Sequence, residues 1–230
     1  MRLSALFRKY ASTARSAVGL FSFVLVAFTG LQGCVTATVE QVRQGATGIG
    51  EHESVVLLGR RHQNGYETEE GFVKCVGGHL RNVKVTSEHD FMDGLYPWFE
   101  PRVAPLEAND LPNLLNRPAV QRKIQSTGIR YLVWVDGSTN TGDSSGTLTC
   151  TISPGGGGCF GFVTWERDSA YEASIWDLKT GTQVGRISSA ASGTSYMPAV
   201  VVPIPLIARV QASACNGLAR QLESFLLDAT

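Results

Sequence analysis

The chain has no excess of charge of either sign. Its 20 Lys and Arg residues balance its 20 Asp and Glu residues, and charged residues make up only 17% of the 230 residues. Proteins that bind nucleic acids concentrate positive charge on one surface, so this composition argues against that class of partner. The sequence therefore predicts no nucleic-acid partner.

Familiar catalytic motifs are also missing. The glycine run Gly155–Gly158 has no Lys-Ser/Thr pair after it and precedes an expected strand, so it does not fit a phosphate-binding loop. Ser195, in Gly-Thr-Ser-Tyr-Met, falls short of Gly-x-Ser-x-Gly. His62, His89 and Asp90 are the side chains best suited to bind a metal or move protons, but polar residues of expected turns seldom form a site. We therefore expect a protein that is not an enzyme and holds no metal or cofactor.

The amino terminus carries the most informative pattern. Four basic residues, Arg2, Arg8, Lys9 and Arg15, precede an apolar run from Ala17 to Ala27. The tetrapeptide Leu-Gln-Gly-Cys follows the run and ends at Cys34. This order is typical of a secretory signal peptide, and the tetrapeptide resembles the site at which bacterial lipoproteins are cleaved and lipidated. We expect residues 1–33 to be a signal peptide and Cys34 to carry the lipid. A membrane-spanning anchor is the alternative, although the run is shorter than the roughly 20 residues that a span needs.

Cleavage at that site leaves 197 residues, with 16 basic and 20 acidic side chains and a net charge of −4. A chain of this length fits one domain. We expect a polar lipidated tether over residues 34–52 and a single domain over residues 53–230. The lipid on Cys34 predicts attachment to a membrane of the bacterial cell envelope. Val35, in place of aspartate after the cysteine, favours an outer-membrane anchor facing the periplasm, by similarity to other lipoproteins.

The other four cysteines make an even set, as expected for an oxidising compartment. Cys150 and Cys159 flank a glycine-rich connection between two strand-like runs, so a short hairpin would bring them opposite each other. Cys75 and Cys215 then pair by elimination. The alternative is that these two are small buried residues on helices that never meet.

Hydrophobic periodicity predicts strands and helices in alternation, followed by hairpins. We expect strands at 54–58, 83–86 and 129–135, helices after Thr68, at 111–127 and from near Pro205, an irregular aromatic crossover at 91–105, and hairpins at 147–165 and 171–190. This order predicts a single-domain α+β or α/β fold, with two to three helices packed on a mixed sheet and extra hairpins in the second half.

The alternation after Ser54, the hairpin turn Asp-Leu-Lys-Thr-Gly at 177–181 and the closing helix carry a family likeness. Together they resemble the small α/β domain shared by the curli secretion lipoprotein and the amino-terminal domain of the Tol-Pal translocation protein. The likeness covers roughly residues 54–227 and transfers no site residue. It implies a recognition or assembly role in the envelope, with an envelope protein or a second copy of the chain as partner.

The stretch 197–208 is an apolar run that contains three prolines. Because proline interrupts helices and is disfavoured in central strands, we expect this stretch to stay out of the sheet. It either covers the core or exposes an interaction surface, with Val201, Ile204 and Leu206, to the membrane, a partner or a second copy.

The function that these features favour is a lipid-anchored, non-enzymatic interaction or assembly module of the cell envelope. One alternative is a periplasmic module that binds a small ligand near Tyr96, Trp98 and Phe99. An envelope hydrolase is a further, weaker alternative.

Overall fold

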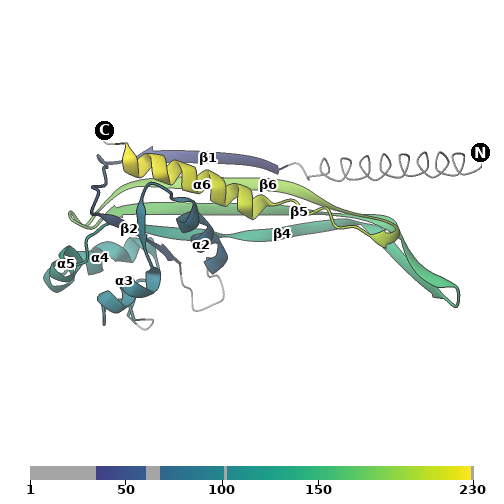
Figure 1. The fold of residues 1–230 in the computed structure, drawn as a ribbon, viewed down its shortest axis with the longest axis horizontal. Coiled ribbons are helices and arrows are strands. Elements are labelled where there is room, and N and C mark those ends of the chain that lie inside the picture. The colour runs from purple at the N-terminus through teal and green to yellow at the C-terminus, as the bar shows by residue number, and fades with distance from the viewer. Residues whose placement is uncertain (1–34, 61–67, 101–102, 229–230) are drawn as a thin grey trace, which may run out of the picture.

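The computed structural model describes residues 35–60, 68–100 and 103–228. Within them, six strands form one mixed sheet in the order β1-β6-β5-β4-β2-β3 (Figure 1). The strands are β1 (Val35–Arg43), β2 (Ser54–Gly59), β3 (Lys84–Thr86), β4 (Ile129–Ser153), β5 (Gly156–Asp177) and β6 (Thr182–Pro203). The helices are α2 (Glu70–His79), α3 (Glu88–Gly94), α4 (Leu111–Leu115), α5 (Pro118–Gln125) and α6 (Val210–Leu227), with a 3-10 turn η1 (Ala108–Asp110). The expected single mixed sheet with helices packed on it is confirmed.

The centre of the sheet is the first half of β4. It is parallel to β2 on one side and antiparallel to β5 on the other, and β2 is also parallel to the short β3. Tyr131, Leu132 and Val133 are fully buried, because helices cover both faces of the sheet here. The continuous apolar run at 129–135 predicted this central position.

Two apolar cores lie on opposite faces of this part of the sheet. On one face, α2 and α6 pack against Tyr131, Val133 and their neighbours. On the other face, α3, α4 and α5 pack against Leu132 and Trp134. The apolar stripe of α6 faces the first core, and its members, spaced at intervals of four residues, are Val210, Ala214, Leu218, Leu222 and Leu226.

The segment expected to be a tether forms an edge strand instead. Residues 35–43 make up β1, which pairs antiparallel with β6 from Val35 opposite Gly193 to Arg43 opposite Gly185. Nearly all of its side chains are exposed. Its polar composition therefore suits a strand at the edge of the sheet as well as it suits a linker.

Helix boundaries differ from the expectation in four places. The helix expected at 111–127 is two helices, α4 and α5. Thr68 does not cap α2, because its hydroxyl donates to the carbonyl of Val135. The stretch 91–105, expected to be irregular, lies partly within α3, whose first turn is capped by the Ser87 hydroxyl accepting from the Asp90 N–H. Helix α6 begins at Val210, and the residues after Pro203 form its connection to β6.

None of the helices in the described ranges is long and apolar enough to cross a membrane. Residues 1–34, with the expected signal peptide and Cys34, lie outside those ranges.

Candidate functional site

Three strands continue far beyond the helices as a projecting extension of the sheet (Figure 1). We call this extension the arm and define it as residues 144–165 and 194–208. Its hairpin runs from the pair Ser144 and Trp165 to the pair Ser153 and Gly156. The third strand, β6, follows β5 outward until Val201 lies opposite Cys159. The hairpin expected around the glycine run is therefore confirmed, and it is the outer part of a much longer one.

Large apolar side chains are exposed along the arm. They come from all three strands and from the connection that follows β6, and they are Ile152, Phe160, Phe162, Val200, Val201, Val202, Ile204 and Ile207. Ile152 and Val200 are 94% and 80% exposed. Exposed apolar side chains scattered singly are common, but a contiguous group marks a contact surface.

The expectation that prolines keep 197–208 out of the sheet was wrong. Residues 197–203 belong to β6, with Pro198 opposite Phe162. Proline is tolerated because β1 ends its pairing at Gly193, so β6 is an edge strand from there on. The chain then folds back beside this edge, where Tyr196 and Leu206 exchange backbone hydrogen bonds of 2.9 and 2.7 Å.

The three residues predicted as an interaction surface all lie on the arm. Val201 and Ile204 are 53% and 44% exposed, whereas Leu206 is half-buried beside Tyr196. The structure places them next to exposed residues of β5 that the sequence interpretation did not single out, namely Phe160 and Phe162.

A second property of the arm is its lack of charge. Residues 144–165 and 187–208 contain no Asp, Glu, Lys, Arg or His, although charged residues make up 17% of the chain. The two runs are each 22 residues long, and they pair with one another where residues 159–165 lie opposite residues 195–201. This charge-free pair of segments is a sequence signal by which the arm could have been found, and the sequence interpretation missed it.

Charged side chains return at the base of the arm. Asp143 on β4 and Glu166, Arg167 and Asp168 on β5 lie there, and Arg167 is opposite Gly193. The first residue of β1, Val35, is also opposite Gly193, on the other side of β6. The chain therefore enters the sheet at the level where the charged part of the molecule meets the uncharged arm.

Both cysteine pairs predicted from the sequence are present as disulfides. Cys150–Cys159 joins β4 to β5 within the arm, with a Cα–Cα distance of 4.0 Å. Cys75–Cys215 joins α2 to α6, with a Cα–Cα distance of 6.3 Å. The alternative that the last two cysteines never meet is thus excluded.

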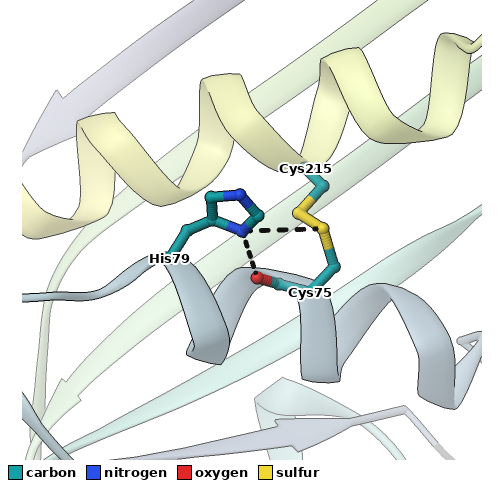
Figure 2. A group of neighbouring side chains, drawn as sticks. All are labelled: Cys75, His79 and Cys215. Carbon is teal, nitrogen blue, oxygen red and sulfur yellow. Dashed lines mark hydrogen bonds between the residues drawn. A yellow bond between two sulfur atoms is a disulfide. The ribbon is translucent and has the colours of Figure 1, made fainter.

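His79 lies beside the disulfide between the helices (Figure 2). It was expected on the packed face of α2, but it is exposed, and its Nδ1 lies 2.8 Å from the Cys75 carbonyl oxygen and 3.8 Å from the Cys75 sulfur. The possible ligand atoms of Cys75, His79 and Cys215 lie within 4.8 Å of one another. Because metals bind thiolates, a pair of sulfurs bonded to each other does not supply such ligands.

Among the described residues, those considered for catalysis form no catalytic arrangement. His62 lies outside the described residues. His89 and Asp90 are exposed on α3, where His89 pairs with Asp93 at 3.1 Å. Ser195 is fully buried, and its hydroxyl accepts the Ala208 N–H at 3.0 Å.

The aromatic residues considered for ligand binding serve mainly as packing. Phe99 is buried with its ring edge-on to Phe91, the ring centroids 4.9 Å apart, and Trp98 packs against the same core. Tyr96 is exposed. A separate groove of about 680 Å³ lies between α2 and α3, with Lys74 and Met92 among its lining residues.

A polar network holds α2 at the point where β4 and β5 leave the body. The Tyr171 hydroxyl donates to Glu69 Oε2 at 2.8 Å and lies 2.7 Å from the Thr139 hydroxyl. The Gln211 amide donates to the same phenol oxygen at 3.3 Å, and the Tyr171 ring stacks on Phe72. Burial, more than any other influence, raises the pKa of Tyr171 to about 12.

Comparison with known proteins leaves the family open. No family model matches the chain, and no characterised protein matches it in sequence. Among solved structures, the PelC dodecamer from Paraburkholderia phytofirmans is 13% identical, with a TM-score of 0.39, over 84% of this chain and 99% of that chain. A variant of the same PelC dodecamer gives 12% identity and a TM-score of 0.39 over 83% and 99% of the two chains. Likenesses this low carry no inference about function.

Proposed function

We propose that this chain is a lipid-anchored, non-enzymatic protein of the bacterial cell envelope, and that it acts as an interaction or assembly module through the arm. The observation that carries the proposal is the arm itself, a projecting and uncharged sheet extension with exposed apolar side chains from three strands. Burying one Val or Phe side chain contributes about 1.5–3 kcal/mol. A surface that covers the exposed apolar side chains of the arm therefore gains a large favourable binding free energy.

The cysteines support the location. Disulfides persist in oxidising compartments such as the bacterial periplasm, and the chain has two. The lipid attachment expected at Cys34 would hold the protein on a membrane, and Val35 after it favours the outer membrane, with the domain facing the periplasm. The likeness to the small α/β domain of the curli and Tol-Pal proteins implies a role of the same kind.

Absence of catalysis is supported by the placement of the polar candidates. Ser195 is buried, and its hydroxyl accepts a hydrogen bond from the Ala208 N–H, so it is not available as a nucleophile. His89 and Asp93 form an exposed pair at i and i+4 of one short helix, which is a common surface arrangement.

The groove between α2 and α3 favours ligand binding as a second candidate function. Its volume of about 680 Å³ lies in the range of small-molecule sites, and Lys74 and His89 supply polar contacts at its rim. A thermal-shift screen of envelope metabolites tests it, since a ligand at 100 times its Kd stabilises the fold by roughly 2.7 kcal/mol.

Two measurements test the proposed function. Mass spectrometry of the mature protein should find the amino terminus at Cys34 with its acyl chains, and Cys34→Ser should release the protein from the membrane fraction. A photo-crosslinking residue at Phe162 should give a covalent adduct with a lipid or a protein in living cells, detected by mass spectrometry, whereas the same residue at Ala170, exposed on the same strand within the body, should give none. Equal labelling from both positions, or none from either, would contradict the arm as the contact element.

A further inference from the structure

We propose that the arm is a lipid-contacting element, which docks on the bilayer that holds Cys34, at the depth of the headgroups and upper acyl chains. This inference rests on the proposed function, because it takes the lipid on Cys34 as the anchor. Four observations favour a lipid surface over other occupants: the place where the chain enters the sheet, the distribution of charge, the face that most aromatic residues of the arm occupy, and the open edges of the strands.

The entry point of the chain puts the anchor beside the arm. Cys34 directly precedes Val35, which lies opposite Gly193 at the base of the arm. Figure 1 shows the first residues of β1 at the end of the body from which the arm projects, with α3 to α5 at the far end. From this level, β5 continues for 11 residues to Gly156, which is about 36 Å at the rise of a strand. An acyl chain on Cys34 therefore brings the membrane to the arm and keeps α3, α4 and α5 away from it.

The charge distribution fits a boundary between water and lipid. A charged side chain at the centre of a membrane costs about 2.5–3.5 kcal/mol on insertion scales. The arm has none, and Asp143, Glu166, Arg167 and Asp168 gather at its base, at the level of the anchor. A protein interface has a polar rim on all sides, whereas charged residues border the arm only at its base, on the side of the anchor.

Phe160, Phe162 and Tyr196 lie on one face of the arm, and Trp165 lies on the other. Side chains alternate along a strand, so Phe160 and Phe162 point away from the face on which Tyr171 and its neighbours contact α6. Phe162 lies near Tyr196, with ring centroids 6.0 Å apart, and Phe160 is opposite Val200. A tyrosine beside apolar side chains suits the membrane interface, where the ring contacts lipid and the hydroxyl contacts water.

The open edges of the arm limit how deep it goes. Strand β2 pairs with β4 only as far as Val135, and among the described residues no other strand pairs with that edge of the outer half of β4. Unpaired backbone groups cost several kcal/mol each in hydrocarbon, and an open sheet edge is therefore excluded from the centre of a bilayer. At the interface, water and headgroups satisfy these groups. The arm thus lies at the surface and does not cross the membrane as a single copy.

A tryptophan reporter tests this placement in the full acylated protein. Phe160→Trp and Val200→Trp place a reporter on the arm, and Ala170→Trp is the matched control on β5 within the body. Each is reconstituted on phospholipid vesicles, with and without bromine on the acyl chains, and titrated with iodide. We expect bromolipid to remove about half or more of the added emission from both arm reporters, since interfacial segments lie about 5–10 Å into the headgroup and acyl boundary. The control should respond to iodide alone.

The other outcomes overturn the proposal and separate its alternatives. Arm reporters quenched by iodide alone would place the arm in water. Arm reporters reached by neither quencher would show that protein covers it, either a second copy or a partner. Val200 is 80% exposed, so its variant should fold even if the Phe160 variant does not. A mass spectrum without acyl chains on Cys34 would contradict the anchor and not the arm. Quenching by bromolipid and iodide would then be measured on the unacylated chain mixed with vesicles.

Discussion

Breaking the disulfide between α2 and α6 should destabilise the protein far more than breaking the one in the arm. Cys75 and Cys215 are 140 residues apart in sequence, and closing a loop of that length stabilises a fold by about 5 kcal/mol in the loop-entropy model. Cys150 and Cys159 are 9 residues apart, for which the same model gives about 2.6 kcal/mol. The first value is comparable with the whole stability of a typical domain, about 5–15 kcal/mol.

The location of each pair widens the difference. Cys215 is fully buried among the residues of the core shared by α2 and α6, so its loss also removes packing. The arm disulfide lies outside both apolar cores. If the arm opens while the body stays folded, its cross-link contributes nothing to unfolding of the body, and the loss lies between zero and about 2.6 kcal/mol.

Urea denaturation of the two double variants, Cys75→Ala/Cys215→Ala and Cys150→Ala/Cys159→Ala, measures both losses. Trp134 and Trp176 are buried in the body, whereas Trp165 lies in the arm, so a Trp165→Phe background lets fluorescence report on unfolding of the body. Circular dichroism reports on the whole sheet. A loss below about 1 kcal/mol for the first variant, or equal losses for both, would refute the loop-entropy argument.

Three further predictions concern packing, ionisation and the arm. Gly185→Ala should lower the free energy of unfolding by about 1–3 kcal/mol, because a Cβ there would lie 2.3 Å from the buried ring of Phe225. Gly78→Ala should not lower it, because a Cβ there meets no neighbouring group within 4 Å, and thermal denaturation compares the two variants. The pKa of Tyr171, raised from 10.0 to about 12, stabilises the fold fully below pH 10, and this contribution falls by up to about 1.4 kcal/mol per pH unit towards pH 12. Urea midpoints should show the fall, and Tyr171→Phe should weaken it. Val201→Asp should leave the melting temperature nearly unchanged because the side chain is exposed, but should abolish adducts from the arm; a collapsed circular dichroism spectrum would show that the residue belongs to the core.

Local patterns in the sequence determined the elements of the body. The apolar run at 129–135 is long enough and β-branched enough to require a strand covered on both faces, and it became the centre of the sheet. The stripe along α6 is visible because helical spacing repeats over 17 residues of one face. The cysteine pairs followed from an even count and one short hairpin.

Tertiary pairing decided the edge of the sheet. Strand β1 has only a short apolar face, Val35, Ala37 and Val39, which lies beside α6 and the core. Its backbone pairing with β6, about 150 residues later, makes it a strand. The prolines of 197–208 broke the sequence pattern of a strand, but they are compatible with β6 because β1 does not pair with it beyond Gly193.

The sequence determined one part of the candidate site, and the tertiary structure determined the other. The sequence by itself determined an apolar, proline-bearing stretch with Val201 and Ile204, and it contained two runs without charge. Only the register of β5 with β6 brought parts of those runs together and placed the charged end of the first run, at Glu166 and Arg167, at the level of the start of β1. Composition is a local property and is readable along the chain, whereas a surface forms from residues that distant strand pairing places side by side.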